Sequence, residues 1–172
     1  MRFGKVVRAI SLITILAAAV GAAAQTPAPQ PAQPQARGGP ASTALNYVPG
    51  VGDMMNLLVQ PRHAKLGLAI AAHNWDLAAY ALKELQQALG TVATVQPKYR
   101  NLTVAEMVQS MTGEATHELD DGIRARSPKR AAAAFDSLTD GCNACHTALG
   151  YPFVVIKTPD ASSFPNQEFK AP

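Results

Sequence analysis

The sequence predicts an all-α fold, a four-helix bundle, on three observations. Four stretches space their apolar residues three and four apart, the repeat of one helical face. Capping residues, prolines and glycines separate these stretches. No stretch of useful length alternates apolar and polar residues as a half-buried strand does. The 172-residue chain suits one domain with one core, and we place the bundle at residues 44–150.

The first helix is expected from about residue 52 to residue 73, with a proline inside it. Pro61 lacks a backbone N–H and cannot continue the hydrogen-bond ladder of a helix. We therefore expect either a kink at Pro61 or a helix that begins there, with residues 54–59 forming a separate turn. The inward face carries residues at spacings of four and three, namely Val59, His63, Leu66, Ile70 and His73.

The second and third helices follow from their caps. Asn74 is a predicted N-cap for a helix over residues 75–95, which the following Gln-Pro pair ends. The third helix is expected to begin near Thr103, where T-V-A-E predicts a capping box with Glu106.

The fourth helix has the clearest start. Ser127 is the predicted N-cap, and Pro128 occupies the first helical position, where its missing N–H is harmless. Gly150 and Pro152 should end the helix. Its core face is expected to carry Phe135, Leu138, Cys142, Cys145 and Leu149.

Residues 1–43 carry no core-forming pattern. Residues 1–24 combine three basic residues, an apolar run and Ala22-Ala23-Ala24, which is typical of a secretory signal peptide with its cleavage site. The apolar run is short for an uncleaved membrane anchor. Residues 25–43 are rich in proline, glutamine and alanine and predict a disordered linker. We expect an exported, periplasmic protein with no membrane span after cleavage.

The charge of the chain argues against a nucleic-acid partner. The sequence has 15 Lys and Arg against 12 Asp and Glu. Because three of the basic residues lie in the expected signal peptide, the remainder carries twelve charges of each sign. The sequence pI of about 9.0 therefore mostly reflects the leader and predicts no basic docking surface.

Both cysteines of the chain lie in one pentapeptide, Cys142-Asn143-Ala144-Cys145-His146. This C-x-x-C-H pattern is typical of covalent c-type haem attachment. Positions three apart share a helical face, so two thiols there can each add to a vinyl group of one haem. His146 would then be the proximal ligand of the iron. The predicted cofactor is one covalent haem c.

Three other interpretations of the cysteine pair stay open. A redox dithiol normally follows a strand and begins a helix, and here no strand precedes it. A zinc site needs a second pair of ligands, and no such pair is spaced in the sequence. A haem-free exported domain with a C-x-x-C disulfide is the third. No G-x-S-x-G, H-E-x-x-H or P-loop motif occurs, and we predict no catalytic residues and no enzyme activity.

With C-x-x-C-H in the last of four predicted helices, the chain resembles the cytochrome c′ family, including its low-spin c-556-type relatives. The resemblance covers about residues 52–150. It implies that Arg62 approaches a haem propionate, that Leu66 crowds the distal face of the iron, and that a homodimer is an option. The chain departs from the family in His63, beside Arg62, and in the tail at 151–172. We expect this tail to pack as an extended flap over the bundle or the haem edge.

The sixth iron ligand decides between two functions. His63 lies on the apolar face of the first helix and is the leading candidate, the alternative being a hydrogen-bonded core histidine. Met54 and Met55 are further candidates, whereas His73 and His117 look solvated. A closed site predicts an electron carrier with periplasmic redox partners. A five-coordinate site predicts a protein that binds NO or CO.

Overall fold

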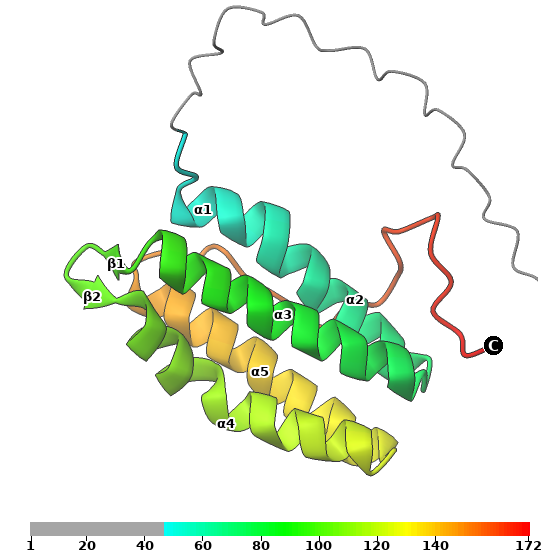
Figure 1. Ribbon diagram of the computed structural model, residues 1–172. Helices are drawn as coiled ribbons and strands as arrows, with labels where there is room; N and C mark the ends of the chain where they lie inside the picture. Colours follow the sequence, from blue (N-terminus) through cyan, green and yellow to red (C-terminus); the bar gives the residue numbers. More distant parts are fainter. Residues whose placement is uncertain (1–46) are drawn as a thin grey trace, which may run out of the picture. The chain divides into compact units, whose positions relative to one another are not determined.

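The computed structural model describes residues 47–172, which form a mostly helical bundle (Figure 1). The expected signal peptide at 1–24 and the linker at 25–43 lie outside the described residues. Within residues 47–172, no helix combines the length and apolar character needed to cross a membrane.

The first predicted helix is a continuous helical run in three segments. These are α1 (Val51–Met54), the π-helical η1 (Met55–Val59) and α2 (Gln60–Ala71). Pro61 lies in the first turn of α2. Proline lacks a backbone N–H, and its ring crowds the preceding turn. A π-helical turn, with its i→i+5 hydrogen bonds, accommodates both changes. The expected disruption at Pro61 is therefore a change of helix type and not a separate turn.

A small hairpin, which the sequence did not predict, joins the second and third helices. Helix α3 (Trp75–Val95) has the predicted bounds, and the side chain of Asn74 accepts the amide of Leu77 as its N-cap. Strands β1 (Lys98–Tyr99) and β2 (Leu102–Thr103) pair antiparallel before α4 (Val104–Arg124).

The predicted capping box at Thr103 is wrong. Thr103 is the N-cap of α4, but its side chain makes no capping hydrogen bond. Its hydroxyl instead accepts a hydrogen bond from Lys98 Nζ at 2.8 Å. Thr103 is also the last residue of β2, and this bond links it to its partner Lys98 on β1.

Helix α5 (Pro128–Ala148) begins and ends where the sequence predicts. Ser127 is its N-cap, and Gly150 follows its last turn with a φ of 83°, a conformation that glycine adopts without strain. The amide of Tyr151 donates to the carbonyl of His146 at 2.8 Å. This bond turns the chain back at the end of the helix and places Tyr151 beside the C-x-x-C-H motif.

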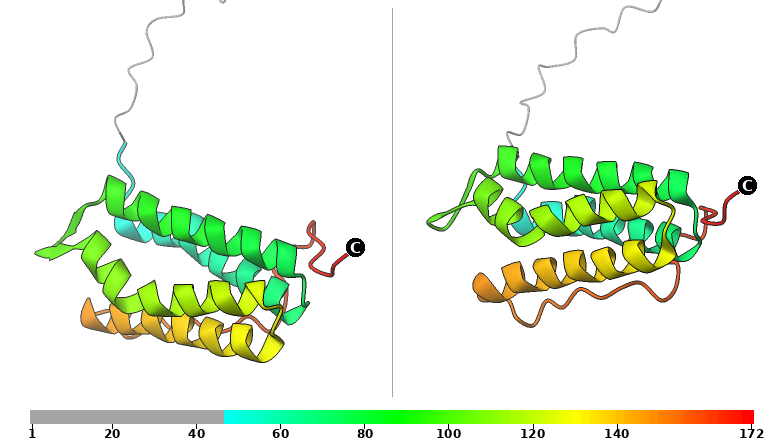
Figure 2. Two further views of the ribbon diagram at one scale, coloured as in Figure 1. Left: turned by 60° about the horizontal axis from the view of Figure 1, so that its bottom comes forward. Right: turned by 90° about the horizontal axis from the view of Figure 1, so that it is seen from below.

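The helices pack as an up-and-down bundle. Consecutive helices α2, α3, α4 and α5 are neighbours, and α2 also contacts α5 and so closes the bundle (Figures 1 and 2). At Gly141 an added Cβ would meet the backbone of Met111, so α4 and α5 approach closely one residue before Cys142. The largest fully buried side chains are Phe135, Leu66, Leu85, Leu119, Leu138, Val92 and Val104.

The first part of residues 151–172 runs back along α5 in an extended conformation, and the last part continues past the end of the bundle (Figure 2). The hydroxyl of Thr158 donates to Asp136 on α5 at 2.8 Å. Pro159 lies so close to Gly67 that an added Cβ there would be 2.7 Å from its ring. Near the end of the chain, the buried ring of Phe169 packs on the core. We call residues 151–172 the tail.

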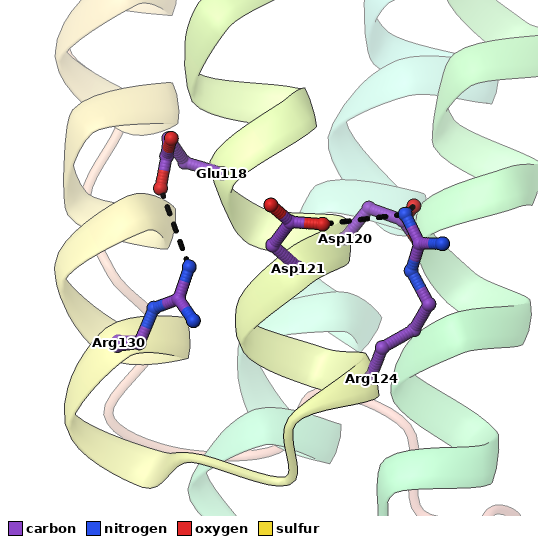
Figure 3. A network of polar contacts seen from close by, with 5 residues as sticks. All are labelled: Glu118, Asp120, Asp121, Arg124 and Arg130. Atoms are coloured by element: carbon purple, nitrogen blue, oxygen red, sulfur yellow. Dashed lines mark hydrogen bonds and ion pairs between the residues drawn. The ribbon is translucent and has the colours of Figure 1, made fainter.

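The acidic residues near the end of α4 are surface groups that pair with arginines. Arg124 bonds Asp120 and lies 3.3 Å from Asp121, and Glu118 lies 3.7 Å from Arg130 at the start of α5 (Figure 3). All these side chains are substantially exposed. They link the ends of two helices and do not form a carboxylate site.

Candidate functional site

A cavity of about 450 Å³ lies at one end of the bundle. Its wall is mostly apolar, and its size falls within the range of small-molecule and cofactor sites. Six parts of the chain form it: the α1–η1–α2 run, Leu89 of α3, Tyr99 of β1, the first half of α4, the end of α5 and the start of the tail. The lining includes Val51, Met55, Val59, His63, Tyr99, Val104, Met107, Val108, Met111, Cys142, Cys145, His146, Leu149, Tyr151, Val154 and Ile156.

The two thiols of the C-x-x-C-H motif face this cavity together. Cys142 and Cys145 are free and partly buried. Burial, with a smaller contribution from Cys145, raises the pKa of Cys142 to about 11, and burial also raises the pKa of Cys145. Both thiols are therefore protonated at neutral pH. A redox dithiol works through a low-pKa thiolate, so the environment of this pair does not favour that chemistry.

His146 is oriented by the tail. Its Nδ1 lies 2.8 Å from the carbonyl oxygen of Val154, and because a carbonyl can only accept, Nδ1 carries the proton. The lone pair is then on Nε2, which makes no hydrogen bond to any residue of the described chain, 47–172. A histidine whose Nδ1–H is held in this way can bind a metal through Nε2, and His146 lines the cavity.

Asn143, between the two cysteines, anchors the tail. Its Oδ1 accepts the amide of Ile156 at 2.8 Å, and its Nδ2 donates to the carbonyl of the same residue at 2.8 Å. This pair of bonds fixes the tail two residues after Val154. Asn143 of the motif therefore helps to hold the Val154 carbonyl in place opposite His146 Nδ1.

His63 lines the cavity as well, but its Nε2 is already engaged. Nε2 lies 2.9 Å from the hydroxyl of Thr139, which in turn donates to the carbonyl of Phe135 at 2.9 Å. The hydroxyl oxygen must accept from His63, which places the proton on Nε2. The ring stacks on Phe135 with 4.6 Å between centroids, and burial lowers the pKa of His63 to about 4. His63 is a buried, neutral histidine of the core between α2 and α5.

The structure places the two other residues suggested by family resemblance away from the cavity. The guanidinium of Arg62 donates to the carbonyl of Leu58 at 2.9 Å and lies 3.7 Å from Glu84 on α3. Adjacent helical residues point about 100° apart, so Arg62 faces α3 when His63 faces inward. Leu66 is completely buried and is not part of the cavity lining.

The remaining candidates for a sixth ligand differ in whether they line the cavity. Met54 is buried in the core outside the cavity, whereas Met55 lines it. His73, stacked on Trp75, and His117 are both exposed, as expected.

Sequence reasoning missed several residues of the wall. Met107 and Met111 of α4 line the cavity with their thioethers, and their position within a helical apolar stripe was the only available signal. Tyr99 and Tyr151 also line it, with their hydroxyl oxygens 2.6 Å apart. They are separated by 52 positions in the chain, and no sequence signal pairs them.

In the described part of the chain, no three histidine, cysteine or acidic side chains gather closely enough to hold a metal ion by themselves. The donor set at the cavity is instead two thiols and one imidazole nitrogen along one turn of α5. No protein-family model, curated protein or solved structure matches this chain.

Proposed function

We propose that this chain is an exported monohaem c-type cytochrome that acts in periplasmic one-electron transfer. The observation that carries the proposal is the state of His146. Its Nδ1–H is bound to the Val154 carbonyl at 2.8 Å, and its Nε2 is free at the wall of the cavity that the two thiols also line. This donor set fits haem c, because attachment needs two thiols and an axial imidazole on one face.

Each residue of the motif has a separate task. Cys142 and Cys145 would hold the ring through thioether bonds, and His146 would bind the iron through Nε2. When bound, haem supplies a metal centre that gains and loses one electron. The Val154 carbonyl keeps the imidazole in one tautomer and makes Nε2 a stronger donor.

The apolar wall sets the electrostatics of the site. Valines, leucines and methionines make up most of the cavity wall. A low local dielectric disfavours added positive charge and therefore favours the reduced form of a bound redox centre. The thioethers of Met55, Met107 and Met111 are the lining groups that could offer a second soft ligand. These features suit an electron carrier.

A five-coordinate protein that binds NO or CO is the second candidate. The observation that favours it is the hydrogen bond between His63 Nε2 and Thr139 at 2.9 Å. A histidine that keeps this bond cannot donate the same nitrogen to a metal. An open coordination position is then left unless a methionine fills it.

Visible spectroscopy and mass spectrometry of the full chain, expressed with a bacterial haem-attachment system, test both candidates. Covalent haem in the mass spectrum is expected, and its absence overturns the cytochrome proposal. A low-spin ferrous spectrum that CO does not change supports the electron carrier. A high-spin spectrum that shifts with CO supports the gas-binding protein.

A further inference from the structure

The mouth of an apolar haem cavity needs polar groups, because haem carries two propionate carboxylates that are costly to leave without partners. Arg62, the residue expected for this task, is bound to Leu58 and Glu84 instead. The polar groups of the cavity wall therefore have to be searched for a carboxylate partner.

One cluster at the wall matches this requirement. Tyr99, from the β1–β2 hairpin, and Tyr151, just after α5, line the cavity with their hydroxyls 2.6 Å apart. The guanidinium carbon of Arg100 lies 5.8 Å and 5.9 Å from the centres of the two rings. Two phenols that line the mostly apolar cavity are therefore gathered with a guanidinium that packs against both rings from outside the lining.

The hydrogen-bonding capacity of the cluster is not used up within the chain. One tyrosine hydroxyl donates to the other, and the accepting hydroxyl keeps its own proton for a further acceptor. Arg100 forms no ion pair with any acidic residue of the described range 47–172.

The backbone also holds Arg100 in an unusual conformation. It follows β1 in the tight turn of the hairpin with a φ of 54°, in the left-handed region that glycine or asparagine usually occupies. Two-residue hairpin turns commonly require such a conformation. Here the turn keeps the guanidinium against both tyrosine rings.

From these contacts we infer that Tyr99, Arg100 and Tyr151 form a carboxylate-binding site for a haem propionate. The inference rests on the proposed function. A guanidinium matches the two oxygens of a carboxylate, and phenol hydroxyls are ordinary carboxylate donors. The hairpin then has a task that the apolar wall cannot perform, namely to fix which edge of the haem faces the end of the bundle.

Reversible binding of haem and of its dimethyl ester to the full chain tests the site. The experiment uses the Cys142→Ala/Cys145→Ala background, in which thioethers cannot form. Arg100→Gln should weaken haem binding roughly tenfold or more, since bonds to charged groups are the strong ones. Binding of the ester, which lacks the carboxylates, should change less than about twofold. Tyr99→Phe and Tyr151→Phe should act in the same direction and remove only hydroxyls.

The matched control is Arg126→Gln. Arg126 is another exposed arginine with a positive φ, 49°, but it lies at the other end of α4 near Asp76. The Arg126→Gln substitution removes the same charge as Arg100→Gln and should leave the affinities for haem and for its ester unchanged. Equal losses for haem and ester, or equal losses in the two arginine variants, overturn the carboxylate site alone. Failure of the proposed function is detected separately: if the full chain with both cysteines carries no covalent haem, that function fails, and this assignment fails with it.

Discussion

The two histidines of the cavity differ in which nitrogen the fold has bound. His146 gives its Nδ1–H to the Val154 carbonyl and keeps Nε2 free, whereas His63 gives its Nε2–H to Thr139. His146 is partly exposed on the last turns of α5, and His63 is buried against Phe135. The same residue type therefore has its Nε2 unengaged at the end of α5 and bound within the core in α2. Spacing along a helix identifies an inward histidine, but only its hydrogen-bond partner shows what the histidine can do.

The largest predicted effect is the loss of covalent haem. The double variant Cys142→Ala/Cys145→Ala should carry no covalent haem, since both attachment points are gone. The helical content should persist, because both side chains are only partly buried. Mass spectrometry under denaturing conditions and far-ultraviolet circular dichroism measure these two outcomes.

His63→Ala is the counterpart on the other side of the cavity. It should retain covalent haem and leave the ligand-dependent visible bands in place, because Nε2 of His63 is bound to Thr139. A change in the spin state of the iron would show that His63 is a ligand and would contradict its assignment to the core.

The acid sensitivity of the protein should come partly from His63. Burial lowers its pKa from 6.5 to about 4, so the unfolded chain binds a proton at this residue at a higher pH than the folded chain does. The stability that the neutral form contributes is complete above pH 6.5 and is lost as the pH falls towards about 4. The loss amounts to about 3 kcal/mol in the free energy of unfolding. Urea unfolding across this pH range measures it.

His63→Gln provides the control for this pH dependence. Glutamine can still donate to the Thr139 hydroxyl but does not titrate. The variant should lose less stability between pH 6.5 and about 4 than the parent does. Parallel curves for the two proteins would mean that His63 is not the group responsible.

Local signals in the sequence were sufficient for the starts of two helices, but not for the capping box expected at Thr103 or for the hairpin that Thr103 ends. Asn74 and Ser127-Pro128 correctly marked the starts of α3 and α5, because capping involves residues within one turn. The C-x-x-C-H motif needed no tertiary information, since its members are consecutive.

Contacts between distant residues were not accessible in the same way. His63 and Thr139 are 76 positions apart, and Tyr99 and Tyr151 are 52 apart. The role expected for Arg62 came from the family resemblance, but the direction of its side chain depends on which face of α2 meets α3. Such pairs are determined by helix packing, and their partners cannot be read from periodicity.

The close approach of α4 and α5 at Gly141 holds the cysteine end of the cavity in place. In Gly141→Ala the new Cβ meets the backbone of Met111, which cannot move aside as a side chain would. The variant should lose about 1–3 kcal/mol of stability through overpacking. Gly90→Ala on α3 is the control, since no atom lies within 4 Å of its Cβ and helix propensity alone favours alanine by about 0.5–1 kcal/mol. The midpoint temperature of thermal unfolding should therefore fall in Gly141→Ala and rise in Gly90→Ala.

The smallest predicted effect is a change in reduction potential that distinguishes the two contacts between α5 and the tail. Asn143→Ala removes both bonds to Ile156, and Thr158→Val removes the bond to Asp136. At about 1 kcal/mol for each hydrogen bond, Asn143→Ala should cost somewhat more stability than Thr158→Val, because it removes two bonds and not one. Only Asn143→Ala loosens the carbonyl that holds His146 Nδ1, and a less basic axial imidazole stabilises oxidised iron less. The reduction potential of the attached haem should therefore rise in Asn143→Ala and stay constant in Thr158→Val. Equal potentials in the two variants would show that the tail covers the cavity without orienting His146.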